Sequence, residues 1–311
     1  MCIAAVASAC GGSGAAPVDV SSTSTTGGTS TTGAELEPPM PMTSSTSADP
    51  EGSTSGSSTG LPAASSSESG STQADTSTGQ AADHPSDRHT PIPVGTDGAP
   101  QGYWEYLPPD FGEGEPPPLL VFLHGLGANG DGDADLDAVL ETAIPGMINA
   151  DDWPADRPFV VLSPQHDGEQ CVGAGEVQSF IAWAVEHYAI DPSRVYLTGV
   201  SCGAFGGWRY LANVTETQIA AAVLIAGSGT SQFNEVGCDL ARAPLWAFHG
   251  DNDGVVDVEG TITPISGLLN CVPTPDVQMT IYEGVGHNSW RRTYDGSEGH
   301  DVFGWMLGYP R

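Results

Sequence analysis

The chain has 311 residues and a formal net charge of −31, from 8 basic and 39 acidic side chains. All eight basic residues are arginines, and the absence of lysine excludes Schiff-base chemistry and the lysine of a P-loop nucleotide site. So acidic a chain also argues against nucleic acid as a partner, because phosphate backbones are bound by clustered cations.

Residues 1–10 resemble a truncated lipoprotein signal segment. A short apolar run and small residues precede Cys10, the pattern of a bacterial lipobox, in which the cysteine is lipidated. The segment departs from that pattern because no basic residue precedes the apolar run, which is also short for a signal. Cys10 is therefore either a lipidated residue or, in the alternative interpretation, an ordinary cysteine in a tail. We expect export, to the cell envelope or beyond it, with membrane contact only through an acylated Cys10.

Residues 11–96 are rich in Ser, Thr, Gly, Ala and Pro and contain few large apolar side chains. Such a composition cannot bury enough apolar surface to offset the entropy lost on ordering. We expect a disordered tether over 11–96 and a catalytic domain over 97–311, which is long enough for a full core.

From residue 102 onward, short apolar segments of strand length alternate with segments of helical spacing. Segments that are apolar on both faces are typical of parallel strands covered by helices. The expected strands are 118–123, 159–162, 194–198, 220–225, 245–248 and 277–282, with 104–107 as an antiparallel edge strand. The expected helices are 175–188, 204–214 and 302–307. This alternation predicts an α/β fold with a mostly parallel sheet, helices on both faces, and ligands beyond the carboxyl ends of the strands.

The domain contains four cysteines, which is an even number, and none lies in a zinc-binding spacing. Two disulfides formed in an oxidising compartment are the simplest use of them. We favour Cys238–Cys271 and Cys171–Cys202, one of three possible pairings, and free buried cysteines remain the alternative.

The pattern G-x-S-x-G occurs twice, and only its surroundings separate the two copies. The copy at 56–60 lies in the expected tether, with no strand before it and no helix after it. The copy at 199–203 follows an expected strand and opens an expected helix, which is the setting of a nucleophile elbow. Ser201 is therefore the candidate nucleophile, beside the N–H groups of a helix amino terminus.

A serine nucleophile needs a base and a group that orients the base. His287 follows the expected strand 277–282, downstream of Ser201, and is the candidate base; an ordinary loop histidine is the alternative. Asp251 and Asp253 both follow the strand 245–248, and either one could instead shape the turn or cap a helix. The amides of Leu126 and Cys202 are candidate oxyanion donors. Trp290, close to His287, is a candidate for the substrate cleft or for the core.

These motifs resemble those of the phospholipase/carboxylesterase-like branch of the α/β-hydrolases. The matching segments are Leu-His-Gly-Leu-Gly (123–127), Gly-Val-Ser-Cys-Gly (199–203), His-Gly-x-x-Asp-x-x-Val (249–256) and Gly-His-Asn-Ser-Trp (286–290). The likeness runs from Trp104 to the end and is nearest to secreted members: dienelactone-hydrolase-like proteins, feruloyl esterases, polyhydroxybutyrate depolymerases and predicted peptidases. It implies Ser201 as nucleophile, Asp253 as acid and His287 as base. Cys202 stands where this family commonly has Met, Gln or Ala.

The sequence thus predicts a serine hydrolase that cleaves carboxylic esters through an acyl-enzyme, without metal or cofactor, as a monomer. Fewer than twenty residues separate the strands ending at Ile225 and starting at Leu245, too few for a large lid. An open cleft favours bulky or polymeric esters. The alternatives are a serine peptidase with the same triad and a non-catalytic envelope-binding module. The alternating carboxylates of 131–137 predict an acidic turn, with a Ca²⁺ loop as the weaker interpretation.

Overall fold

The computed structural model describes residues 84–311; residues 1–83, which include Cys10 and most of the expected tether, lie outside the described part. The described residues form one eight-stranded sheet in the order β1-β2-β4-β3-β5-β6-β7-β8. Strands β3 to β8 are parallel, and β1 and β2 are antiparallel to their neighbours. The strands are β1 (His89–Ile92), β2 (Tyr103–Tyr106), β3 (Leu119–Leu123), β4 (Val160–Pro164), β5 (Val195–Val200), β6 (Ala221–Ile225), β7 (Leu245–Gly250) and β8 (Val277–Tyr282).

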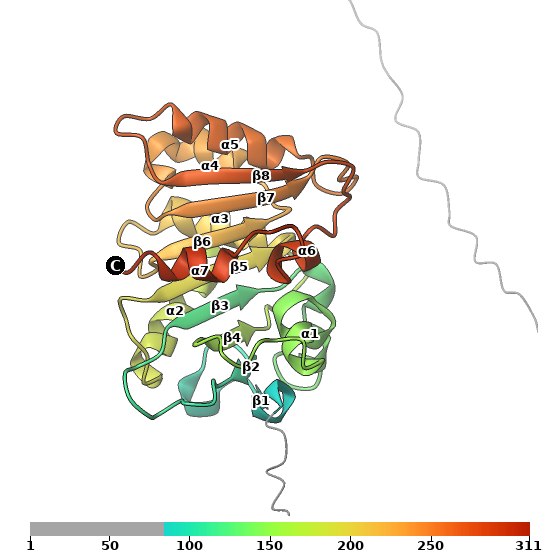
Figure 1. Cartoon of the computed structure of the whole chain (residues 1–311), viewed down its shortest axis with the longest axis vertical. Coiled ribbons are helices and arrows are strands. Elements are labelled where there is room, and N and C mark those ends of the chain that lie inside the picture. Colours follow the sequence, from blue (N-terminus) through green and yellow to red (C-terminus); the bar gives the residue numbers. More distant parts are fainter. Residues whose placement is uncertain (1–83) are drawn as a thin grey trace, which may run out of the picture. The chain divides into compact units, whose positions relative to one another are not determined.

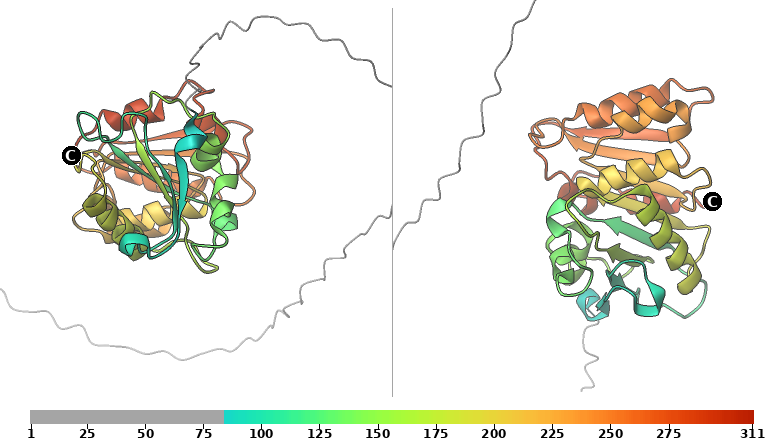
Figure 2. Two further views of the ribbon diagram at one scale, coloured as in Figure 1. Left: turned by 90° about the horizontal axis from the view of Figure 1, so that it is seen from below. Right: turned by 180° about the vertical axis from the view of Figure 1, so that it is seen from behind.

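Helices cover both faces of this sheet, as the apolar strands require. The α-helices are α1 (Ala143–Asn149), α2 (Ala174–His187), α3 (Cys202–Asn213), α4 (Thr230–Val236), α5 (Glu259–Leu269), α6 (Trp290–Tyr294) and α7 (Val302–Leu307). The 3₁₀ turns are η1 (Pro85–Arg88), η2 (Thr96–Gly98), η3 (Leu126–Ala128), η4 (Leu136–Glu141) and η5 (Gly237–Leu240). Helices α1, α6 and α7 lie on one face and α2 to α5 on the other (Figures 1 and 2).

Alternation along the central strand β3 divides the core in two. Leu119 and Leu123 pack on the α2–α3 face, in a cluster with Phe180 and Trp208. Leu120 and Phe122 belong to the cluster on the opposite face, which contains the α1 and α7 side chains. A strand that is apolar on both faces can only be stable between two helical layers, and the expected α/β sheet is confirmed.

The folded part begins earlier than the expected boundary at residue 97. Strand β1, at residues 89–92, lies inside the segment 11–96 that the sequence assigned to the tether. It pairs antiparallel with β2, so β2, expected as the edge strand, lies between β1 and β4. The prediction failed because β1 is short, polar and contains Pro91, which removes the hydrophobic alternation; proline is tolerated on an edge strand.

Both favoured cysteine pairs are disulfides in the structure. Cys171 is bonded to Cys202 and Cys238 to Cys271, with Cα–Cα distances of 4.9 and 5.8 Å. Two disulfides are compatible with an oxidising compartment. Among residues 84–311, no helix combines the length and the apolar character that crossing a bilayer requires.

His89 on β1 is a buried histidine whose two ring nitrogens have no hydrogen-bond partner among the described residues. Its ring packs on Trp104, with centroids 4.7 Å apart. Burial lowers the pKa of His89 from 6.5 to about 4, because an imidazolium would lose its hydration there.

Replacing His89 by Leu is expected to make the fold less sensitive to acid. Below pH 6.5 the unfolded chain binds a proton at this position that the folded chain rejects. The wild type therefore loses about 1.4 kcal/mol of stability per pH unit between pH 6.5 and 4 from this group. Urea unfolding at pH 7 and pH 4.5 measures the difference: the loss on acidification should be about 2 kcal/mol smaller in the variant. Equal losses in both proteins would contradict the expectation.

Candidate active site

Ser201 lies at a sharp turn between β5 and α3. Its backbone has φ 51° and ψ −117°, in a region that residues other than glycine rarely occupy. The flanking glycines permit the turn: a Cβ on Gly199 would come 2.6 Å from the carbonyl carbon of Gly203. A Cβ on Gly203 would overlap the carbonyl oxygen of Leu123 at the end of β3. The helix begins at Cys202, two residues earlier than expected, so the serine stands directly at its amino end.

The side chains of Ser201, His287 and Asp253 form one hydrogen-bonded relay. The Ser201 Oγ lies 2.9 Å from His287 Nε2, and His287 Nδ1 lies 2.7 Å from Asp253 Oδ2. A carboxylate only accepts, so Nδ1 carries the proton and Nε2 presents its lone pair to the Ser201 hydroxyl. The Asp253 side chain is fully buried, whereas that of His287 is 20% exposed. The relay thus reaches solvent beside the serine and the histidine.

Backbone amides fix the Asp253 carboxylate. Its Oδ1 accepts from the N–H groups of Val255 at 2.8 Å and Val256 at 3.0 Å. Burial by itself would raise the pKa of Asp253, but the hydrogen bonds from His287 and from these amides outweigh burial and lower it. Asp253 is therefore an anion at neutral pH, as an acid that supports an imidazolium must be.

The structure separates the two candidate acids. Asp251 is exposed, and its Oδ1 accepts from the N–H of Gly284 at 2.6 Å, which ties together the loops after β7 and β8. It thus shapes the turn, as one interpretation of the sequence allowed, and Asp253 contacts the histidine. A third group, which was not among the predicted site residues, is the buried His249, whose Nε2 lies 3.0 Å from Asp253 Oδ2. Its only sequence signal was its place in the His-Gly-x-x-Asp-x-x-Val motif.

The two candidate oxyanion donors lie beside Ser201. Leu126 is the first residue of η3 and Cys202 the first of α3, so neither N–H has an acceptor within its own helix. The loop of Leu126 contacts the nucleophile, because a Cβ built on Gly125 would lie 3.7 Å from the Ser201 Cβ. Two free amides beside the serine suit a developing oxyanion.

The loop after β4 is bonded to the segments that carry both candidate donors, Leu126 and Cys202. The N–H of His166 donates to His124 Nε2 at 2.9 Å, and His124 Nδ1 donates to the carbonyl of Gly125 at 2.7 Å. Burial lowers the pKa of His124 to about 4, so the ring is neutral and its Nε2 can accept. Five residues after His166, Cys171 is disulfide-bonded to Cys202. One loop thus holds the first donor through His124 and the second through a covalent bond.

Loss of the Cys171–Cys202 disulfide is expected to lower kcat, whereas loss of Cys238–Cys271 is not. The bridges span 31 and 33 residues, so replacing either pair by serines should cost a similar stability, about 3–4 kcal/mol in the chain-entropy model. Only the first loosens a donor, so its effect on kcat should stay below the about 10²–10³-fold loss that removal of a donor produces. Ester hydrolysis by the two double-serine variants measures this difference. Equal kcat values in the two would contradict it.

Trp290 stands edge-on to His287, with ring centroids 5.3 Å apart. It is partly buried against the core and also lines a cavity of about 290 Å³ between α1 and α6. Trp290 thus packs against the core, as one interpretation had it, and its place in a substrate cleft stays a prediction. Ala143, Met147 and Asn288 also line the cavity, which makes it a mixed apolar and polar space on the histidine side of the site.

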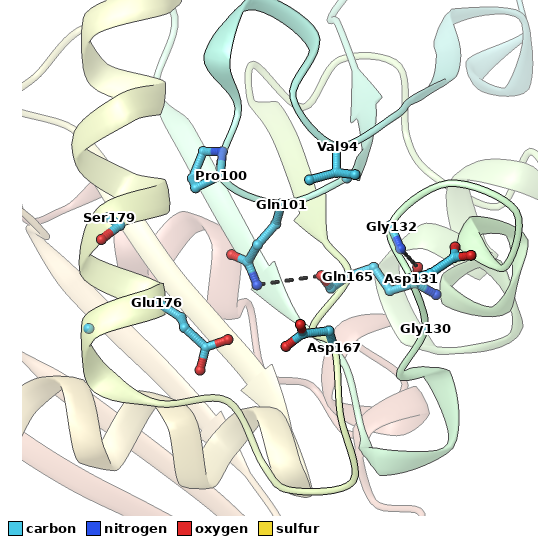
Figure 3. A pocket seen from close by; sticks show the side chains of 12 residues that line it. Val94, Pro100, Gln101, Gly130, Asp131, Gly132, Gln165, Asp167, Glu176 and Ser179 are labelled. Atoms are coloured by element: carbon cyan, nitrogen blue, oxygen red, sulfur yellow. Dashed lines mark hydrogen bonds between the residues drawn. The ribbon is translucent and has the colours of Figure 1, made fainter.

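A second cavity of about 290 Å³ lies beyond the carboxyl end of β4, between α2 and the loops that contain Gln101 and Asp131 (Figure 3). The side chains of Gln101, Asp131, Asp167, Glu176 and Ser179 line it, with the buried Gln165 as its floor. Ligand atoms of His166, Asp167 and Glu176 lie within 4.8 Å of one another, the spacing of a metal site. However, His166 Nδ1 already bonds Glu176 at 2.8 Å, and its Nε2 lies 2.8 Å from the carbonyl of Gln170. A metal would have to displace these hydrogen bonds.

The acidic segment 131–137 forms a turn closed by its own first side chain. Asp131 Oδ1 accepts from the N–H groups of Asp133 at 2.9 Å and Asp135 at 3.2 Å, and these bonds lower the pKa of Asp131. This geometry agrees with the expected acidic turn before η4.

No protein-family model matches the chain, and no curated protein matches it in sequence. In structure it is similar to a thermostable esterase, with a TM-score of 0.54 and 24% identity over 72% of this chain and 64% of that one. It is also similar to an acetyl xylan esterase from Aspergillus awamori, with a TM-score of 0.50 and 15% identity over 70% of this chain and 99% of that one. A third similar structure is dipeptidyl peptidase 4 of Porphyromonas gingivalis, with a TM-score of 0.52 and 14% identity over 71% and 35% of the two chains.

At these identities the likeness concerns the fold, and the chain spans less than two thirds of the thermostable esterase. The strand order, the helices on both faces and the serine turn after β5 agree with it. The described residues of this chain therefore have the α/β-hydrolase fold.

Proposed function

We propose that this protein is a serine hydrolase that cleaves carboxylic esters through an acyl-enzyme. The observation that carries the proposal is the relay from Ser201 Oγ through His287 to Asp253, with distances of 2.9 and 2.7 Å. Two further observations support it. Two backbone amides at helix starts lie beside the serine, and two structures similar to this chain are those of esterases.

In this proposal Ser201 Oγ attacks the carbonyl carbon of the ester while His287 Nε2 takes the hydroxyl proton. The carbonyl oxygen becomes an oxyanion, which the amides of Leu126 and Cys202 stabilise. The tetrahedral intermediate collapses, the bond to the alcohol oxygen breaks, and His287 returns the proton to that oxygen. Water, deprotonated by His287, then attacks the acyl-enzyme and releases the acid and the free serine. Asp253 holds Nδ1 and stabilises the imidazolium throughout.

Bulky or polymeric esters with an apolar acyl group are the proposed substrates. The segment between β6 and β7 forms only α4 and η5, which pack on α3 and α5. The site therefore receives no lid from that segment. Two large apolar side chains beside the relay, Leu126 and Val255, are exposed. The cavity beside Trp290 lies on the side of His287. His287 gives its proton to the leaving alcohol on this side, so the cavity suits the alcohol part of the ester.

A serine peptidase is the second candidate, because the same relay cleaves amides and a similar structure is named as a dipeptidyl peptidase. A non-catalytic binding module is the third, and the ready hydrogen-bond geometry of the relay counts against it. The proposed setting is an exported protein, tethered to a membrane if Cys10 carries a lipid, and monomeric.

Fluorophosphonate labelling of the folded protein followed by peptide mass spectrometry tests the proposal. The adduct is expected on Ser201, and in an assay series of p-nitrophenyl esters, feruloyl esters, polyesters and peptides the esters should be hydrolysed fastest. An unlabelled Ser201 would favour the binding module, and faster hydrolysis of the peptides would favour the peptidase.

A further inference from the structure

His249 is a fully buried histidine at the end of β7 that the relay itself does not require. Its Nε2 lies 3.0 Å from Asp253 Oδ2 and 3.0 Å from the carbonyl oxygen of Val256. Its Nδ1 lies 2.9 Å from the hydroxyl of Thr261 on α5. Carboxylate and carbonyl oxygens only accept, so Nε2 carries a proton and donates it toward Asp253.

With this bond, the Asp253 carboxylate has as many donors as it has lone-pair sites. An ionised carboxylate accepts about four hydrogen bonds. Oδ1 takes the amides of Val255 and Val256, and Oδ2 takes Nδ1–H of His287 and Nε2–H of His249. The Asp253 side chain has no exposed surface, so water cannot replace a missing donor from outside. His249 therefore completes the set that fixes this carboxylate.

The location of the two histidines gives them different roles. The titratable groups in contact with His249 are Asp253 and, across the shared Oδ2, His287. In the sheet, β7 pairs His249 with Ile281 of β8, and the residue after β6 is Ala226, so the neighbouring strands supply no charge. His249 thus acts on the relay only through Asp253.

We propose that His249 is a positioning residue, which holds the Asp253 carboxylate in the plane from which it orients His287. This inference rests on the proposed function. Without the Nε2–H bond, one lone pair of the buried Oδ2 has no donor, only His287 still bonds this oxygen, and the carboxylate can rotate about the Oδ1 that the amides hold. The imidazole then loses its alignment with Ser201, and a displacement of about 1 Å can lower the rate about 10²-fold.

A matched pair of variants isolates the single bond. In His249→Gln the amide nitrogen reaches the position of Nε2 and can still donate to Asp253. In His249→Asn the amide reaches only the position of Nδ1, toward Thr261. We expect the Gln variant to keep kcat within about threefold and the Asn variant to lose about 10²-fold in kcat, with KM nearly unchanged. The low-field proton NMR signal of the His287–Asp253 bond should persist in the Gln variant and be lost in the Asn variant.

The controls separate this proposal from the proposed function and from a loss of stability. Wild type is labelled with fluorophosphonate first: if Ser201 does not react, the proposed function fails before His249 is tested. If wild type reacts and both variants keep the wild-type kcat, only the His249 inference is overturned. The same holds if both variants lose kcat and the size of each loss follows the decrease in that variant's melting temperature. His89→Leu, which removes another buried histidine at the far edge of the sheet, should keep kcat. If the Asn variant does not fold, His249→Leu, which fills the site but has no donor for Asp253 Oδ2, should lower kcat about 10²-fold in a folded protein, and an unchanged kcat would overturn the inference.

Discussion

Replacing Ser201 by Ala is expected to lower kcat for ester hydrolysis by about 10⁶-fold, the size of loss expected when a triad nucleophile is removed. The Ser201 hydroxyl lies 2.9 Å from His287 Nε2 and is placed there by the strained turn after β5, so the substitution removes the group that the base activates. Activity left in the variant should come from the oxyanion donors and substrate binding alone. Initial rates with a p-nitrophenyl ester, together with loss of fluorophosphonate labelling, measure the effect.

Ser58→Ala is the matched control, because Ser58 occupies the same letters in the other G-x-S-x-G copy at 56–60. This variant should keep full activity and full labelling. A Ser201→Ala protein that hydrolyses the ester at the wild-type rate would remove the acyl-enzyme mechanism altogether.

Replacing Asp253 by Asn is expected to lower kcat by about 10⁴-fold while leaving the fold intact, because it changes the tautomer of the base. Oδ1 of Asp253 accepts from two backbone amides, so an asparagine must place its oxygen there and its NH₂ at the position of Oδ2. That NH₂ donates to His287 Nδ1, which moves the imidazole proton to Nε2 and faces it toward Ser201. The base then has no lone pair for the serine proton.

A pH profile of kcat from pH 6 to 10 accompanies the measurement. Partial recovery of the Asp253→Asn rate at alkaline pH would mean that Ser201 ionises without the help of the base. Asp251→Asn is the matched control: this carboxylate bonds the amide of Gly284 and no histidine, so kcat should change less than about threefold. A larger loss in Asp251→Asn than in Asp253→Asn would contradict the assignment of the acid.

Local patterns in the sequence were sufficient to locate strands β2 to β8 along the chain and two of the three relay residues. Segments that are apolar on both faces pack between helices, so β3 to β7 and the parallel sheet follow from composition. Parallel strands end at one rim, so Ser201 after β5 and His287 after β8 were expected at the same edge of the sheet. Strands β6 and β7 lie between them, and the loop after β8 brings the histidine to the serine. The tight turn likewise follows from Gly199 and Gly203, whose missing side chains it requires.

Contacts between segments far apart in the chain decided the rest. Whether Asp251 or Asp253 faces His287 depends on how one loop folds against another, since both follow the same strand. His249 became a partner of Asp253 because a strand side chain and a loop side chain meet across a turn. The short β1 forms because its backbone pairs with β2, and the hydrophobic periodicity of the sequence does not indicate this pairing. Hydrophobic alternation depends on residues that are neighbours in the sequence. A hydrogen-bonded site depends instead on the directions in which side chains from distant segments point, and only the tertiary structure determines these directions.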